Sequence, residues 1–298
     1  DGAGRRPGFW NEAFARAERL QAALARGDAP PEAERATRDR LLRMSVARGG
    51  RMLELASRFL GLSDLLAIRR RMIGTGLIGG KSVGMLVARA ILRANEPDLK
   101  AALEPHDSFF IGADVFYTYL VENDIWWLKQ RQKEQEQDVY LEEAETARQK
   151  ILEGAFPAYI MESFQDMLDY FGQSPIIVRS SSLLEDGFGN AFAGKYESVF
   201  CVNQGSPAKR LEQFIDAVRR IYASTMSETA LRYRAQRGLL QRDEQMALLV
   251  QRVSGARYGR YHLPQAAGVG LSFNPYAWSP SIDPHAGVLR LVFGLGTR

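Results

Sequence analysis

The residues best suited to chemistry stand together in the second half of the sequence, where Arg179 is followed by three serines. A guanidinium group presents a planar fork of donors that suits phosphate, and consecutive serines add hydroxyl and backbone N–H donors beside it. Two carboxylates, Glu185 and Asp186, and a glycine-interrupted turn come next. This stretch alone leaves two interpretations open: a phosphate-binding loop, or a solvated loop in which Arg179 pairs with one of the carboxylates.

A glycine-rich loop far upstream adds weight to the phosphate interpretation. Residues 73–84 contain five glycines and one lysine, Lys81, directly before an apolar helical stretch at 85–92. Glycines let backbone N–H groups approach a phosphate closely, and the start of the following helix favours negative charge. Only seven of the 39 basic residues are lysines, so chance alone seldom places one in a glycine loop.

The glycine loop does not match a P-loop. That motif needs a glycine, four residues and then Gly-Lys-Ser/Thr, whereas counting back from Gly80 puts Thr75 where the first glycine belongs. We also predict no strand in front of the loop, because residues 65–72 are arginine-rich and helix-like. The spacing therefore excludes a Walker A site.

Segments of regular structure must position these two sites. An apolar run at 175–178 predicts a buried strand that carries Arg179 and the serines into a loop too polar for the core. Periodicity and capping predict helices at 9–26, 31–48, 51–60, 63–71, from 81, at 113–122, within 139–171, at 207–222 and at 227–237. Apolar runs predict further strands at 108–111, 196–202, 246–253, 266–272 and 288–293. Helices first and strands late indicate an α+β fold.

Together the two sites resemble the N-terminal nucleotide-binding domain of the phosphoenolpyruvate synthase and pyruvate phosphate dikinase family. Gly79-Gly80-Lys81 before a helix is similar to the first family motif, although the closing glycine is not at the family spacing. Val178-Arg179-Ser180-Ser181, with Glu185-Asp186 and a Phe-Ala-Gly step at 192–194, is similar to the second. Further similar runs at 221–224, 250–253 and 267–275 keep the family order to the end of the chain.

The resemblance implies an ATP-grasp-like, two-lobed α+β domain with a helical N-terminal extension. We expect the extension at residues 1–72 and the ATP-binding domain at 73–298, truncated at its C-terminus. The chain begins with Asp1 rather than methionine and stops within what resembles another family motif. We therefore expect a piece of a longer protein.

The resemblance also implies roles for single residues. Lys81 and Arg179 would be catalytic, because an ammonium and a bidentate fork stabilise charge that develops on a transferring phosphate. Gln251 stands where the family's strand approaches the adenine, although a plain core-strand role is equally open. The implied nucleotide-binding residues are Gly79, Gly80, Lys81, Arg179, Ser180, Ser181, Glu185 and Gln251.

ATP and Mg²⁺ are the implied cofactors, but the metal ligands stay unassigned. Family members have Gly-Leu-Gly-Glu where this chain has Thr297 after residues 294–296. Magnesium prefers hard oxygen ligands and usually keeps one or two carboxylates. Two interpretations stay open: a substitute carboxylate lies beyond the sequence, or catalysis is weakened.

The implied activity is that of an ATP-dependent phosphotransferase. It would pass phosphoryl groups from ATP to a histidine on a domain absent from this chain. The implied partners are the downstream phosphohistidine and phosphoenolpyruvate/pyruvate-binding domains, because none of the three histidines here has the context of the acceptor. The alternative is a degenerate, non-catalytic nucleotide-binding module that serves regulation or scaffolding.

Composition narrows the class of protein. The 46% hydrophobic and 25% charged fractions are typical of a soluble globular chain, and no apolar run approaches the ~20 residues that span a bilayer. Residues 1–71 hold 15 arginines against 9 acids, but these charges interleave at helical spacings, which indicates a solvated face. With one cysteine, Cys201, and no signal segment, we expect a cytoplasmic protein that binds neither membrane nor nucleic acid.

Overall fold

A computed structural model describes residues 8–127, 137–184, 194–239 and 242–294 of the chain. The chain divides into two compact units, Asp1–Arg252 and Val253–Arg298. The boundary predicted at residue 72 is a different one and stays a prediction. No helix in the described ranges is long and apolar enough to cross a membrane.

The first unit is organised around a five-stranded sheet with the order β1-β2-β5-β3-β4. The strands are β1 (Met72–Ile73), β2 (Ser108–Ile111), β3 (Ile176–Ser182), β4 (Ser198–Cys201) and β5 (Met246–Arg252). The pair β1–β2 is parallel, and the other pairs are antiparallel. The two longest strands, β3 and β5, pair in the middle of the sheet, so their backbones are hydrogen-bonded on both sides.

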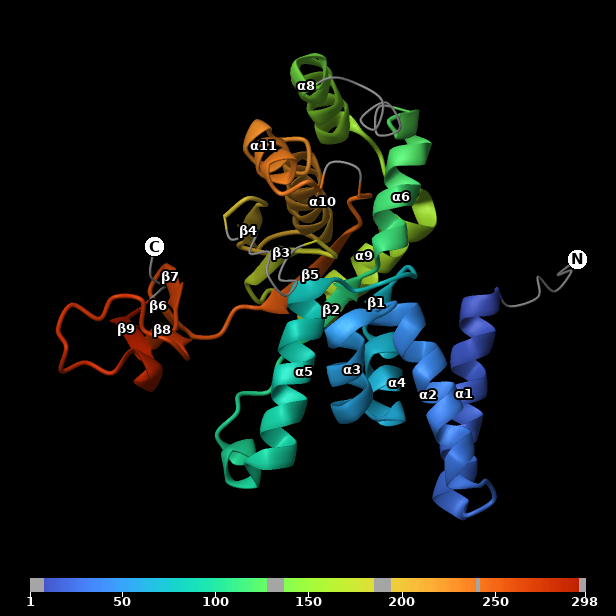
Figure 1. The fold of residues 1–298 in the computed structure, drawn as a ribbon. Helices are drawn as coiled ribbons and strands as arrows, with labels where there is room; N and C mark the ends of the chain where they lie inside the picture. Colours follow the sequence, from blue (N-terminus) through green and yellow to red (C-terminus); the bar gives the residue numbers. More distant parts are fainter. Residues whose placement is uncertain (1–7, 128–136, 185–193, 240–241, 295–298) are drawn as a thin grey trace, which may run out of the picture. The chain divides into compact units, whose positions relative to one another are not determined.

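One face of the sheet packs against the N-terminal helices (Figure 1). These helices are α1 (Phe9–Arg26), α2 (Pro31–Ser45), α3 (Gly50–Phe59), α4 (Leu62–Arg70) and α5 (Gly80–Asn95), followed by the short η1 (Pro97–Ala101). Residues that pair across antiparallel strands share a face. The pair Phe110 and Leu249 therefore points into the same apolar core as Leu65 and Val83. The helices before the glycine loop thus share one core with the sheet.

The opposite face carries a second, larger core. Its helices are α6 (Ala113–Glu122), α8 (Gln137–Glu153), α9 (Ala158–Phe171), α10 (Pro207–Ser224) and α11 (Glu228–Gln236). Val178 and Val250, which pair between β3 and β5, enter this core beside Phe116 and Tyr222. The predicted start of α10 is confirmed, because the side chain of Ser206 caps the helix by accepting the N–H of Lys209 at 3.3 Å.

The prediction that no strand precedes the glycine loop is wrong. Helix α4 ends at Arg70, and the two residues of β1 then pair with Phe110 and Ile111 of β2. A two-residue strand is defined by its partner rather than by its own pattern, so the arginine-rich sequence before it carries no signal. The spacing argument against a P-loop is unaffected.

The second unit contains two antiparallel pairs of strands. They are β6 (Ala256–Tyr258) with β7 (Tyr261–Leu263), and β8 (Ala266–Leu271) with β9 (Val288–Phe293), with η2 (Pro284–Ala286) before β9. The hairpin β6–β7 was not expected, and its second strand contains His262. Gly268 permits close pairing of β8 and β9, because an added Cβ would lie 2.5 Å from the carbonyl oxygen of Arg290.

Candidate functional site

The start of α5 and the middle of the sheet border a pocket of about 490 Å³, which we call the lysine pocket. It is lined by Gly80, Lys81, Gly84, Met85, Arg179, Leu249 and Gln251. Lys81 lies in the first turn of α5, Arg179 in β3 and Gln251 in β5. Four of the residues predicted for the site from separate motifs, Gly80, Lys81, Arg179 and Gln251, therefore meet at one place.

Gly79 joins the two motifs directly. Its φ is 80°, and an added Cβ would lie 1.4 Å from the carbonyl oxygen of Ser181. The contact is locked by hydrogen bonds, because Ser181 Oγ donates to the carbonyl of Ile78 at 2.9 Å and accepts the N–H of Ser82 at 3.1 Å. Only glycine combines this backbone angle with this approach, so the glycine loop is held against the end of β3.

The prediction that residues 179–182 form a polar loop is wrong. They complete strand β3, and Ser180, Ser181 and Ser182 are each 0% exposed. Their burial is favourable because each hydroxyl has a hydrogen-bond partner. Ser180 Oγ accepts from Lys81 Nζ at 3.1 Å, and Ser182 Oγ donates to the carboxylate of Glu244. These partners lie in distant parts of the sequence, so the local pattern resembles that of a loop.

Ser180 and Ser181 therefore lie behind the lysine pocket rather than on its wall. Both hydroxyls are used by protein groups, one by Lys81 and the other by the glycine loop. Gly79 also packs on β3 and does not line the pocket. The predicted nucleotide-binding role of these three residues stays a prediction, and the structure shows them holding Lys81 and α5 in place.

Arg179 is the most unusual group at the pocket. Its Nε atom is buried and has no hydrogen-bond partner among the described residues. In the described lining, Lys81 and Arg179 are both cationic and no carboxylate accompanies them. A buried donor without an acceptor is destabilising, and two cations without an anion repel each other. The arrangement favours an anionic ligand.

Gln251 is held in place by two side-chain contacts. Its Nε2 atom donates to Ser108 Oγ at 3.2 Å and to Met85 Sδ at 3.3 Å. It pairs with Ser108 across β2–β5, so both side chains are on the face covered by α5. Gln251 lies in a central strand and also lines the pocket, and its approach to the adenine stays a prediction.

Sequence reasoning missed residues that build the site. Ser82 and Gly84 belong to the glycine loop itself, so the motif offered a signal for both. An added Cβ at Gly84 would meet no atom within 4 Å, which means that this position opens onto the pocket. Glu244 gave no signal, because its partners Ser182 and Tyr196 stand elsewhere in the sequence.

Other predicted features lie outside the described residues. Glu185, Asp186 and Thr297 fall there, and nothing follows about their geometry. Among the residues that the structure does describe, no group of three or more His, Cys, Asp or Glu side chains is placed to hold a metal ion.

Burial raises the pKa of the Cys201 thiol to about 11, and the nearby charge of Asp216 acts in the same direction. Cys201 is thus a packing residue, as its apolar run indicates.

Comparison with known proteins places the chain in a family. The family model described as pyruvate phosphate dikinase, AMP/ATP-binding domain, matches residues 75–298. Among curated proteins no match to this chain is found. The match covers well over half of the chain and includes both motifs that meet at the lysine pocket, so the resemblance and the α+β fold class are confirmed. The chain therefore belongs to the family of pyruvate phosphate dikinase AMP/ATP-binding domains.

Proposed function

We propose that the lysine pocket binds the phosphates of ATP and that the domain passes a phosphoryl group from ATP to a histidine on another domain of the longer protein. The observation that carries this proposal is the meeting of two cations, Lys81 and Arg179, in a pocket whose described lining has no carboxylate. Membership of an AMP/ATP-binding family supports a nucleotide as the anion.

The residues present fit a phosphate chain. The pocket, at about 490 Å³, lies within the range of about 300–1,000 Å³ that is usual for ligand sites. Arg179 is carried by a central strand, and Ser180 holds the ammonium group of Lys81 at 3.1 Å. Both cations are therefore positioned before the ligand arrives. Donors that need no reorganisation are effective at stabilising charge during phosphoryl transfer.

The described residues fit a phosphate better than they fit a metal. Magnesium needs hard oxygen ligands, usually with one or two carboxylates, and the described lining of the lysine pocket supplies none. We assign no step to a metal ion. Lys81 and Arg179 supply the positive charge that this chain itself contributes to the reaction.

Titration calorimetry with ATP tests the binding step. Lys81→Ala and Arg179→Ala should each weaken binding by about tenfold to a hundredfold, because hydrogen bonds between charged groups are lost. Lys209→Ala and Arg19→Ala remove the same charges from exposed positions and should leave the affinity unchanged. Absence of any heat from the wild-type chain at millimolar ATP would refute the proposal.

A steric block tests the location of the ligand. Gly84→Leu adds a side chain where no protein atom lies within 4 Å, so it fills the pocket without a clash in α5. It should abolish ATP binding with the melting temperature kept or raised, since leucine is the better helix former. Gly84→Ala is the matched control and should bind nearly as the wild type does. Unchanged affinity in Gly84→Leu would place ATP elsewhere.

Transfer requires the full-length protein. Labelled ATP should leave an acid-labile phosphate on a histidine, and Lys81→Ala should abolish this label. A full-length protein that binds ATP in the lysine pocket but never acquires the label would favour the alternative, a non-catalytic nucleotide-binding module.

A further inference from the structure

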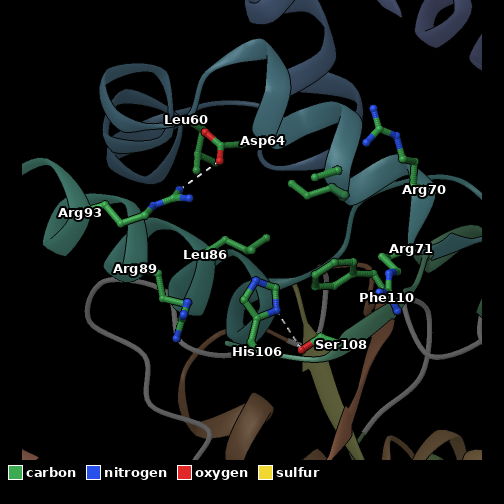
Figure 2. Close-up of a pocket in the computed structure, with 12 residues that line it drawn as sticks. Leu60, Asp64, Arg70, Arg71, Leu86, Arg89, Arg93, His106, Ser108 and Phe110 are labelled. Atoms are coloured by element: carbon green, nitrogen blue, oxygen red, sulfur yellow. Dashed lines mark hydrogen bonds and ion pairs between the residues drawn. The ribbon is translucent and has the colours of Figure 1, made fainter. Parts of the chain in front are cut away.

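A second pocket of about 460 Å³ lies on the same sheet face and shares helix α5 with the first. We call it the arginine pocket; its lining includes Arg70, Arg71, Arg89, Arg93, His106 and Phe110. Figure 2 shows Arg89 and Arg93 of α5 on one side, Arg70 and Arg71 on the other, and Leu86 and Phe110 between them. The two pockets have no lining residue in common, but they are neighbours, because Gln251 of the lysine pocket donates to Ser108 of the arginine pocket at 3.2 Å.

The positive charge of the arginine pocket is not balanced by the described residues around it. Asp64 is the one carboxylate in the described lining, and it is taken by Arg93 at 3.0 Å. Arg71 pairs with two residues that do not line the pocket: the carboxylate of Asp107 at 3.3 Å and the hydroxyl of Tyr170 at 2.8 Å. Within the described chain, Arg70 and Arg89 have no hydrogen-bond or ion-pair partner. Two guanidinium groups are thus available to a ligand.

The positive charges of the arginine pocket also affect the pKa of His106. Its Nδ1 atom lies 3.2 Å from Ser108 Oγ. Partial burial of the imidazole, followed by the positive charges of Arg89, Arg71 and Arg93, lowers its pKa. The ring is therefore neutral near neutral pH and adds no further charge. Its second nitrogen stays able to hydrogen-bond a ligand.

The wall between the arginines is apolar. Leu60, Ile68 and Phe110 form its base and are buried, at 2%, 3% and 2% exposed, so the partly exposed Leu86 offers the accessible apolar surface. The family match begins at residue 75, and the lining residues that lie before it include Leu60, Ile68, Arg70 and Arg71. The pocket therefore combines a helical segment outside the matched range with α5 and β2 inside it.

We propose that the arginine pocket binds a small phosphorylated organic molecule, with its phosphate held by guanidinium groups on one side of the pocket and its apolar part against Leu86. A phosphate monoester carries close to two negative charges, so it balances the excess arginines better than a carboxylate does. The concave apolar wall fits a small molecule better than an extended nucleic acid strand. This inference does not depend on the proposed function of the lysine pocket.

Calorimetry with phenyl phosphate as the probe tests the charge requirement. The double variant Arg70→Ala/Arg89→Ala should bind at least about tenfold more weakly, because two charged hydrogen-bond donors are lost. The matched control, Arg19→Ala/Arg35→Ala, removes the same net charge from exposed positions of α1 and α2 and should bind as the wild type does. If both double variants lost the same affinity for phenyl phosphate, the effect would come from the net charge of the surface, and the proposal would be overturned.

Three further arms locate the probe and define its class. Ala67→Phe keeps all four arginines but adds a ring to an exposed position that lines the pocket, and should also abolish binding. Gly84→Leu, which blocks the lysine pocket, should leave phenyl phosphate binding unchanged. Inorganic phosphate and benzoate should each bind about tenfold more weakly than phenyl phosphate, because each lacks one of the two features that the pocket recognises. The proposal fails if Gly84→Leu abolishes binding, if Ala67→Phe retains it, or if either simpler anion binds as tightly.

Discussion

The lysine pocket and the arginine pocket lie on one face of one sheet and use one helix, but the chain encodes them in different ways. The cations of the lysine pocket come from two compact motifs, and Leu249 and Gln251 of β5 complete its lining. The arginine pocket is built from residues of α4, α5 and the segment around β2 that share no motif. In the first, Ser180 and the glycine loop position Lys81 and α5. In the second, Arg71 and Arg93 are paired, whereas Arg70 and Arg89 have no partner among the described residues. A site that requires a specific backbone conformation can thus be recognised from a sequence motif, whereas a site formed by packing of separate helices has no motif by which to recognise it.

The strongest test of this comparison is Gly79→Ala. We expect a loss of at least about 3 kcal/mol of unfolding free energy, since alanine is strained at positive φ and its Cβ would collide with the Ser181 backbone. Gly84→Ala is the matched control and should keep or raise stability, because it is helical and meets open space. Chemical denaturation measures both. Equal stability of the two variants would show that the glycine loop is not locked to β3.

Ser181→Ala probes the hydrogen bonds of the same contact. The change removes the partner of the Ile78 carbonyl and of the Ser82 N–H, so we expect a loss of about 1–3 kcal/mol. Ser57→Ala is a control, since Ser57 Oγ donates only to the Leu53 carbonyl within its own helix and its loss should be within about 0.5 kcal/mol. If the two variants denature alike, the buried hydroxyl is not what fixes α5 to the strand.

Arg71→Ala and Arg70→Ala should separate the structural from the available arginines. Arg71 bonds Asp107 and Tyr170 and lies over the Phe109 and Tyr170 rings, at 4.8 and 4.1 Å from their centroids. Its loss should lower the unfolding free energy by about 1 kcal/mol. Arg70→Ala should stay within about 0.5 kcal/mol. A larger effect from Arg70 than from Arg71 in thermal melts would contradict the division of the pocket into held and free cations.

The smallest effect concerns the pH dependence of His106. Its pKa is lowered from 6.5 in the folded protein, so the unfolded chain takes up the proton first as the pH falls. Its contribution to stability is therefore present above the unfolded pKa and is lost as the pH falls from that value through the lower pKa of the folded state. Between about pH 7.5 and about pH 5.5, wild-type melting temperature should fall slightly more than that of His106→Gln. Bound phenyl phosphate should raise the pKa of His106, which proton NMR can follow, and an unchanged pKa would separate His106 from the ligand.

Much of the fold was predictable from local sequence. The helices at Phe9–Arg26 and Ala113–Glu122 and the strands at Ser108–Ile111 and Val288–Phe293 have the predicted bounds. Helix periodicity, capping and apolar runs act within a few residues, so they can be recognised without the fold. Helix α2 ends at Ser45, earlier than the predicted residue 48, and β4 is shorter than predicted, because element ends depend on neighbours as well as on pattern.

The sequence by itself determined the family, the two motifs and the pairing of Lys81 with Arg179 as candidate phosphate-binding residues. Only the tertiary structure decided that the serines after Arg179 are buried in a strand, since their partners Lys81, Ser82 and Glu244 come from other segments. It likewise decided β1, the hairpin β6–β7 and the arginine pocket. The physical reason is the same in each case. Whether a polar group is stable in a core, or a cation lacks a partner at a surface, depends on which groups from distant parts of the chain lie within hydrogen-bonding distance. Local sequence does not specify those distances.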